Sequence, residues 1–137
     1  MNTLIPMFYF LFLLLPFLLV NDTLQPGQRI ENTLEGEVTH EYVIELSQGQ
    51  FVTGYVEQQS VDVKLTIKGP DDQILKEIDS FSQELEHFDF ESDAAGAYTV
   101  TVAGDDDDGT YAIQLVRAEP IATDAAARVD QLMSLYA

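Results

Sequence analysis

Apolar and polar residues alternate along most of the chain between residues 29 and 117. The clearest stretch runs from Gly96 to Arg117, where two alternating segments flank a run of four Asp residues. The apolar positions of these segments are Tyr98, Val100, Val102, Tyr111, Ile113 and Leu115. A period of two places one side of a strand on a core. The pattern therefore predicts two strands joined as a hairpin by an acidic turn.

The same period predicts about six further short strands. They are expected at residues 29–34, 38–46, 51–57, 61–68, 74–78 and 84–91. Gly54, in the middle of one of them, suggests a bulge or a close backbone approach. Turn signals such as Gly69-Pro70 recur about every ten residues. About eight short strands at this spacing predict an all-β fold, a jelly-roll-like antiparallel β-sandwich.

The N-terminal segment, residues 1–20, departs from this pattern. Residues 4–20 carry no charge, and about 17 apolar residues is short for a membrane span and long for the core of a signal peptide. We interpret residues 1–20 as a signal peptide, with an uncleaved N-terminal anchor as the alternative. Both interpretations place the predicted sandwich, residues 24–118, outside the cytoplasm: secreted or periplasmic in one case, membrane-anchored in the other.

The C-terminal segment, residues 119–137, is predicted to be a linker followed by a short amphipathic helix. The sequence Ala118-Glu119-Pro120 is expected to end the last strand, and Thr123 or Asp124 can cap the helix. Residues at helical spacing then form one apolar face, namely Val129, Leu132, Met133 and Tyr136. A helix of about 13 residues is marginal alone. It is therefore expected to pack on the sandwich, on a partner, or on a further domain.

The charge of the chain excludes two classes of partner. Asp and Glu number 24 against 6 Lys and Arg, for a net charge of −18. Nucleic acid and anionic membranes attract basic surfaces, so membrane contact is expected only through an uncleaved N-terminal segment. The chain has no cysteine, which excludes a disulfide framework.

No set of residues forms a recognisable active site, so the chain is not expected to be an enzyme. None of the six serines has a Lys three positions later, as S-x-x-K hydrolases require. His40 is followed by Glu41 but not by the second His of a zinc protease motif. Exposed aromatic side chains are candidate contacts for a ligand, and the aromatic residues considered are Tyr9, Tyr55, Phe81 and Tyr136.

Calcium is the one cofactor that the sequence suggests. Asp105, Asp106, Asp107 and Asp108 are adjacent, between two glycines. Calcium prefers several carboxylate and carbonyl oxygens, and a cation would relieve the repulsion among these four groups. The default interpretation is a solvated turn that holds no ion, and calcium binding is the alternative.

With the strands in place, the chain resembles a bacterial pre-peptidase C-terminal domain. The resemblance lies in LQPGQRIENTLEGEVTHEYVIELSQGQFVTGYVEQQSVDVKLTIKGPDDQIL, which runs from Leu24 to Leu75, and in the later GAYTVTVAG and GTYAIQLV. Asp72 replaces the Gly that usually follows Pro-Asp in this pattern. The resemblance implies a non-catalytic β-sandwich attached to secreted peptidases and other extracytoplasmic enzymes. It also implies that some relatives bind calcium or a polymeric substrate.

The tail ATDAAARVDQLMSLYA is similar to the linker and first helix that precede serine β-lactamase-related hydrolase domains. A variant of the sandwich also precedes caspase-like or helical-repeat regions. We therefore expect an accessory module that assists a secreted enzyme, by docking on a hydrolase or peptidase domain or by holding a polymeric substrate. One alternative is the N-terminal part of a hydrolase, and another is a calcium-dependent adhesion module.

Overall fold

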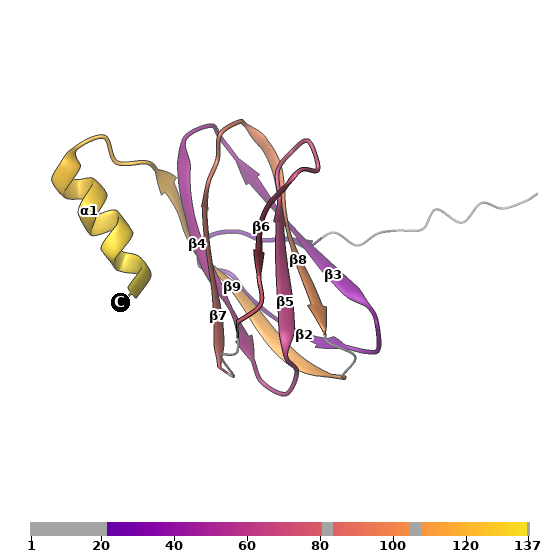
Figure 1. Ribbon diagram of the computed structural model, residues 1–137. Coiled ribbons are helices and arrows are strands. Elements are labelled where there is room, and N and C mark those ends of the chain that lie inside the picture. Colours follow the sequence, from indigo (N-terminus) through magenta and orange to yellow (C-terminus); the bar gives the residue numbers. More distant parts are fainter. Residues whose placement is uncertain (1–21, 81–83, 105–107, 137) are drawn as a thin grey trace, which may run out of the picture.

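The computed structural model describes residues 22–80, 84–104 and 108–136, which form two facing sheets and a C-terminal helix (Figure 1). The first sheet has the order β1 (Asp22–Thr23), β3 (Thr39–Leu46), β8 (Gly96–Gly104), β5 (Val63–Lys68) and β6 (Ile74–Ile78). The second has the order β2 (Arg29–Leu34), β9 (Gly109–Pro120), β4 (Gln50–Gln58) and β7 (Leu85–Glu91). All neighbours are antiparallel except β1 and β3. The predicted β-sandwich is confirmed.

The core lies between the sheets and is built from the alternating residues of each strand. Both sheets contribute fully buried side chains, among them Tyr42, Ile44, Leu65, Ile67, Phe88, Tyr98, Val100, Tyr111, Ile113 and Leu115. The apolar positions predicted around the acidic turn are all buried. In the part of the chain that the structure describes, no helix is long and apolar enough to cross a membrane.

The predicted hairpin of β8 and β9 is wrong. Strand β8 pairs with β3 and β5 in the first sheet, whereas β9 pairs with β2 and β4 in the second. The connection between Gly104 and Gly109 therefore crosses from one sheet to the other. Alternation shows which side of a strand is buried, but it does not show which strand lies beside it.

Strand β9 also extends further than predicted. It continues through Pro120, because Gln50 pairs with Pro120 and Phe51 with Glu119. Proline lacks only the N–H donor, so it is tolerated at the end of a strand. The helix α1 (Ala125–Met133) follows, with Asp124 as its N-cap and a 3₁₀ turn, η1 (Ser134–Tyr136), after it. The Asp124 side chain accepts a hydrogen bond from the Ala127 amide at 3.0 Å, which confirms the predicted cap.

Asp72, the residue that departs from the family pattern, adopts a left-handed backbone. Its φ is 66°, in the region that favours glycine. The turn that it completes is closed by hydrogen bonds from the Asp72 amide to the Gly69 carbonyl and from the Gly69 amide to the Gln73 carbonyl. Asp tolerates this conformation better than most residues, so the turn forms without the usual glycine.

Gly54 has a packing role in β4. A Cβ atom at this position would lie 2.2 Å from Cζ of Phe88 and 2.5 Å from the backbone oxygen of Gln114. Gly54 and Phe88 are paired across β4 and β7, so the buried Phe88 ring covers the space that a side chain would fill. The sequence feature that suggested a close approach is thereby explained.

Four polar side chains form a hydrogen-bonded chain in this core. Asn32 Nδ2 lies 3.4 Å from the Tyr42 hydroxyl, which lies 2.5 Å from the Tyr111 hydroxyl. The Tyr111 hydroxyl lies 2.7 Å from His40 Nδ1. His40 and Tyr42 belong to β3, whereas Asn32 and Tyr111 belong to the opposite sheet. The chain therefore links the two sheets through the core.

The Asn32 amide donates to the Tyr42 oxygen. Either hydroxyl can be the donor between Tyr42 and Tyr111, and the Tyr111 hydroxyl can donate to His40 Nδ1 when that nitrogen carries no proton. Burial lowers the pKa of His40, an effect that the charge of Asp22 partly opposes. Burial and the bond with Tyr42 raise the pKa of Tyr111.

We expect Gly54→Ala to lower the free energy of unfolding by about 2–3 kcal/mol, because the new methyl group overpacks the core against a ring and a backbone oxygen. Urea denaturation measures this change. Gly69→Ala is the matched control, since its Cβ would meet the flexible Asp71 carboxylate at 3.1 Å. Equal stabilities of the two variants would contradict the packing role of Gly54.

The stability of the fold should decrease as the pH falls through the ordinary pKa of histidine, 6.5. The folded state disfavours the proton on His40, so the unfolded chain binds it more readily and stability is complete only above this pH. In His40→Gln the amide oxygen can accept from Tyr111 without titrating. Chemical denaturation at pH 8 and pH 5 should show a larger loss for the wild type than for this variant. Equal losses would contradict the role of His40.

Candidate functional site

The acidic turn is only partly within the described residues. Asp105, Asp106 and Asp107 lie outside them. Asp108 is exposed, and its carboxylate accepts a hydrogen bond from the Gly36 amide at 2.5 Å. That bond ties the turn to the connection between β2 and β3. Among the residues that the structure describes, no group of three or more acidic or histidine side chains is arranged to hold a metal. Calcium binding at this turn stays a prediction.

Other residues considered for chemistry have structural partners. His40 Nδ1 is engaged by Tyr111, which removes that nitrogen as a free ligand or base. The Ser92 hydroxyl donates to the Ser47 carbonyl at 2.6 Å, and the Ser134 hydroxyl donates to the Gln131 carbonyl at 2.6 Å. These contacts account for the side chains as parts of the fold.

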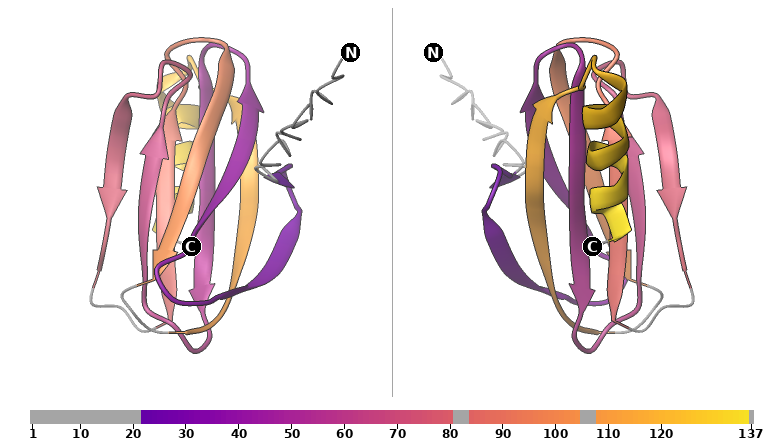
Figure 2. Two further views of the ribbon diagram at one scale, coloured as in Figure 1. Left: turned by 90° about the vertical axis from the view of Figure 1, so that its right-hand side faces the viewer. Right: turned by 90° about the vertical axis from the view of Figure 1, so that its left-hand side faces the viewer.

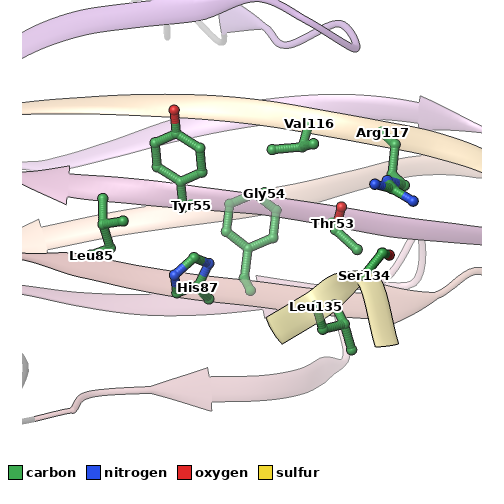
Figure 3. Close-up of a pocket in the computed structure, with 10 residues that line it drawn as sticks. Thr53, Gly54, Tyr55, Leu85, His87, Val116, Arg117, Ser134 and Leu135 are labelled. Carbon is green, nitrogen blue, oxygen red and sulfur yellow. The ribbon is translucent and has the colours of Figure 1, made fainter. Parts of the chain in front are cut away.

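A cavity of about 420 Å³ opens on the outer face of the second sheet, beside the C-terminal turn (Figure 3). Strands β4, β7 and β9 supply its floor and η1 supplies one wall. Its lining residues are Thr53, Gly54, Tyr55, Leu85, His87, Phe88, Val116, Arg117, Ser134 and Leu135. Of the aromatic residues considered from the sequence, Tyr55 is the one that the structure places here. Tyr9 and Phe81 lie outside the described residues, as does the side chain of Tyr136.

A β-bulge shapes the floor of this cavity. The pairing of β4 and β9 shifts between Thr53 and Gly54, so that Thr53 pairs with Arg117 and Gly54 with Leu115. Val116 is the extra residue. A bulge changes the direction of the side chains around it, and both Val116 and Arg117 line the cavity (Figure 3). Leu115 is buried in the core.

The aromatic side of the cavity is held by contacts between neighbouring strands. Tyr55 and His87 are paired across β4 and β7, with ring centroids 6.1 Å apart. The Tyr55 hydroxyl donates to the side-chain oxygen of Gln114 on β9 at 2.6 Å. Buried or half-buried tyrosines usually have such a partner. The bond fixes the ring beside the cavity.

Helix α1 lies along the outer face of the second sheet (Figures 1 and 2). The Arg128 guanidinium lies 5.2 Å from the centre of the Phe51 ring and pairs with the Glu91 carboxylate. Phe51 is only 1 % exposed, although its strand position points it away from the core. Cation–π contacts of this kind stabilise an exposed site by about 0.5–1 kcal/mol.

A buried glutamine completes the attachment of α1. The Gln131 amide nitrogen donates to the Glu119 carboxylate and to the Pro120 carbonyl, both at 3.0 Å. Its oxygen accepts from the Ala122 amide at 3.1 Å and from Arg128 at 2.6 Å. Gln131 is thus fully used in hydrogen bonds, and it holds the helix to the end of β9.

The helix therefore packs on the sandwich through its polar side. The residues expected to form the packing face are exposed instead: Val129 is 58 % exposed, Leu132 40 % and Met133 61 %. The physical reason lies in the surface beneath, where Glu91 and Glu119 flank Phe51 and favour Arg128 and Gln131 as contacts. Amphipathic spacing identifies an apolar face, but it does not say that this face meets the rest of the same domain.

Every Lys and Arg of the chain has a carboxylate partner. The nitrogen–oxygen distances are 2.6 Å for Arg29–Glu31, 2.8 Å for Arg29–Glu57, 3.5 Å for Lys64–Glu77, 3.8 Å for Lys68–Asp72, 3.3 Å for Lys76–Asp89 and 3.6 Å for Arg117–Glu119, and Arg128 pairs with Glu91. Such exposed pairs contribute little stability. Their main effect is that no basic side chain is left to compensate the other acidic residues, which make up most of the 24.

No family model and no curated protein matches the sequence. The fold matches several solved structures, among them two with a TM-score above 0.5. The pre-peptidase C-terminal domain of a collagenase from Bacillus anthracis has a TM-score of 0.54 and 14 % sequence identity, covering 69 % of this chain and 93 % of that one. PliG from Aeromonas hydrophila, a periplasmic inhibitor of g-type lysozyme, has a TM-score of 0.53 and 14 % identity, covering 69 % of this chain and 95 % of that one.

At 14 % sequence identity, the similarity to these two structures shows a shared fold alone. The resemblance predicted from the strand motifs is confirmed in that respect: this chain has the β-sandwich fold of a pre-peptidase C-terminal domain, which PliG shares.

Proposed function

We propose that this chain is a non-catalytic module that works outside the cytoplasm by binding a positively charged enzyme. The observation that carries the proposal is the pairing of all six Lys and Arg side chains in a chain of net charge −18. The surface then presents excess carboxylates on several sides. A field of one sign speeds the encounter with a partner of opposite charge and repels partners of like charge.

The fold supports the choice of an enzyme as the partner. One structure with this fold is a domain of a collagenase, and another is an inhibitor of g-type lysozyme. In both cases the sandwich is associated with an enzyme. The described residues of this chain offer an exposed cavity and an exposed apolar side of α1, while His40, Ser92 and Ser134 are hydrogen-bonded within the fold. Binding is therefore the activity that the geometry supports best.

The location outside the cytoplasm rests on two observations. The apolar, uncharged residues 4–20 fit an export signal or an anchor, although they lie outside the described residues. The inhibitor that shares the fold is periplasmic. A chain without cysteine depends on its core rather than on disulfides in such a compartment, and the buried interface between the two sheets supplies that core.

The proposal predicts a salt-sensitive complex with an enzyme. Biolayer interferometry with the immobilised chain should detect binding of a g-type lysozyme or of a secreted collagenase, with affinity falling about tenfold or more between about 50 mM and 500 mM salt. A variant with Glu35→Gln and Glu37→Gln, both exposed, should associate more slowly, because the attractive field is weaker. Absence of binding to either enzyme at low salt, or affinity independent of salt, would overturn the proposed function.

A further inference from the structure

Large exposed hydrophobic side chains gather on one side of the molecule. Of the eight in the described residues, five lie on α1 or at the cavity beside it, namely Leu85, Val116, Val129, Leu132 and Met133. We call these five residues the helix face. The other three are Val38, Ile74 and Leu75. Single exposed apolar residues are ordinary, but a gathering of them marks an interaction site.

Building on the proposed function, we propose that the helix face is the surface that docks on the enzyme. The occupant is a folded protein surface on which an apolar side chain projects among Lys and Arg residues. The apolar side chain enters the cavity between Leu85, Val116 and Leu135, and the basic residues lie against the carboxylates around it.

Charge complementarity favours this occupant over a second copy of the chain. The carboxylates around the helix face belong to Glu57, Asp89, Glu91, Glu119, Asp124 and Asp130. Four of these six carboxylates have a basic partner in the same region: Glu57 pairs with Arg29, Asp89 with Lys76, Glu119 with Arg117 and Glu91 with Arg128. Asp124 and Asp130 supply the excess negative charge there. Two copies meeting through this face would bring that excess together, and each copy carries a net charge of −18, so the contact would be costly. An anionic membrane is disfavoured for the same reason.

The cavity has the chemistry of an anchor site. Aliphatic side chains and the rings of Tyr55 and His87 supply contact area. The hydroxyl groups of Thr53 and Ser134 add polar groups at the margin. Interfaces often concentrate their binding energy where one large side chain fills such a pocket. The bulge that brings Val116 and Arg117 to the same face places the apolar Val116 side chain in the floor of this cavity.

The attachment of α1 prepares this surface for binding. Arg128 and Gln131 fix the helix through Phe51, Glu91 and Glu119, so the exposed residues do not need to be ordered when the partner arrives. Preorganisation of this kind lowers the entropic cost of association.

The test compares two double variants in the binding experiment with the g-type lysozyme and the collagenase. Leu132→Ser with Met133→Ser removes two apolar groups of the helix face, and Ile74→Ser with Leu75→Ser is the matched control on β6. All four side chains are exposed, so both variants should fold, and thermal unfolding checks this. We expect the helix-face variant to bind roughly tenfold more weakly or worse, and the control to bind as the wild type does.

Each outcome separates this inference from the proposed function. If the wild type binds, and the helix-face variant binds equally well, the docking surface is elsewhere and only this inference is overturned. If the wild type binds neither enzyme, the proposed function fails, and this inference fails with it. If sedimentation shows a wild-type dimer that the helix-face variant cannot form, the occupant is a second copy and the inference is overturned.

Discussion

The pairing of β4 with β9 is the contact on which the outer surface of this protein depends. Its bulge at Thr53 and Gly54 turns Val116 and Arg117 to one side and so forms the floor of the cavity. The same pairing extends to Pro120, so that β9 ends beside Phe51. Helix α1 follows and lies along the outer face of this sheet (Figure 2). A regular ladder ending earlier would remove both features.

Much of the architecture follows from the period of two. Buried positions such as Val63, Leu65 and Ile67 could be predicted because a half-buried strand must alternate, and the turns between strands are marked by Gly, Pro and Asp. The cap at Asp124 was predictable for a similar local reason. The fold resemblance could be predicted too, since its motifs are themselves strand and turn positions.

The surface of the protein could not be predicted in the same way. Which strands become neighbours depends on contacts between distant segments. The local sequence pattern therefore does not show that β8 and β9 lie in different sheets. The cavity had one local signal, Gly54 within an alternating strand, but the residues that line it come from four separate elements. The face of α1 that packs is decided by Phe51, Glu91 and Glu119, and the first two are far from the helix in sequence.

The order of the strands also has a consequence for how the protein folds. Within the described part of the chain, strand β2 pairs only with β9, through contacts such as Ile30 with Ile113, and β3 has its long ladder with β8. During synthesis from the N-terminus, β2 and β3 therefore stay without these partners until the segments that form β8 and β9 have been made. Contacts between residues far apart in sequence slow folding, and exposed strand edges invite misassociation meanwhile. Repulsion between the many carboxylates of neighbouring chains would oppose the association of partly folded molecules.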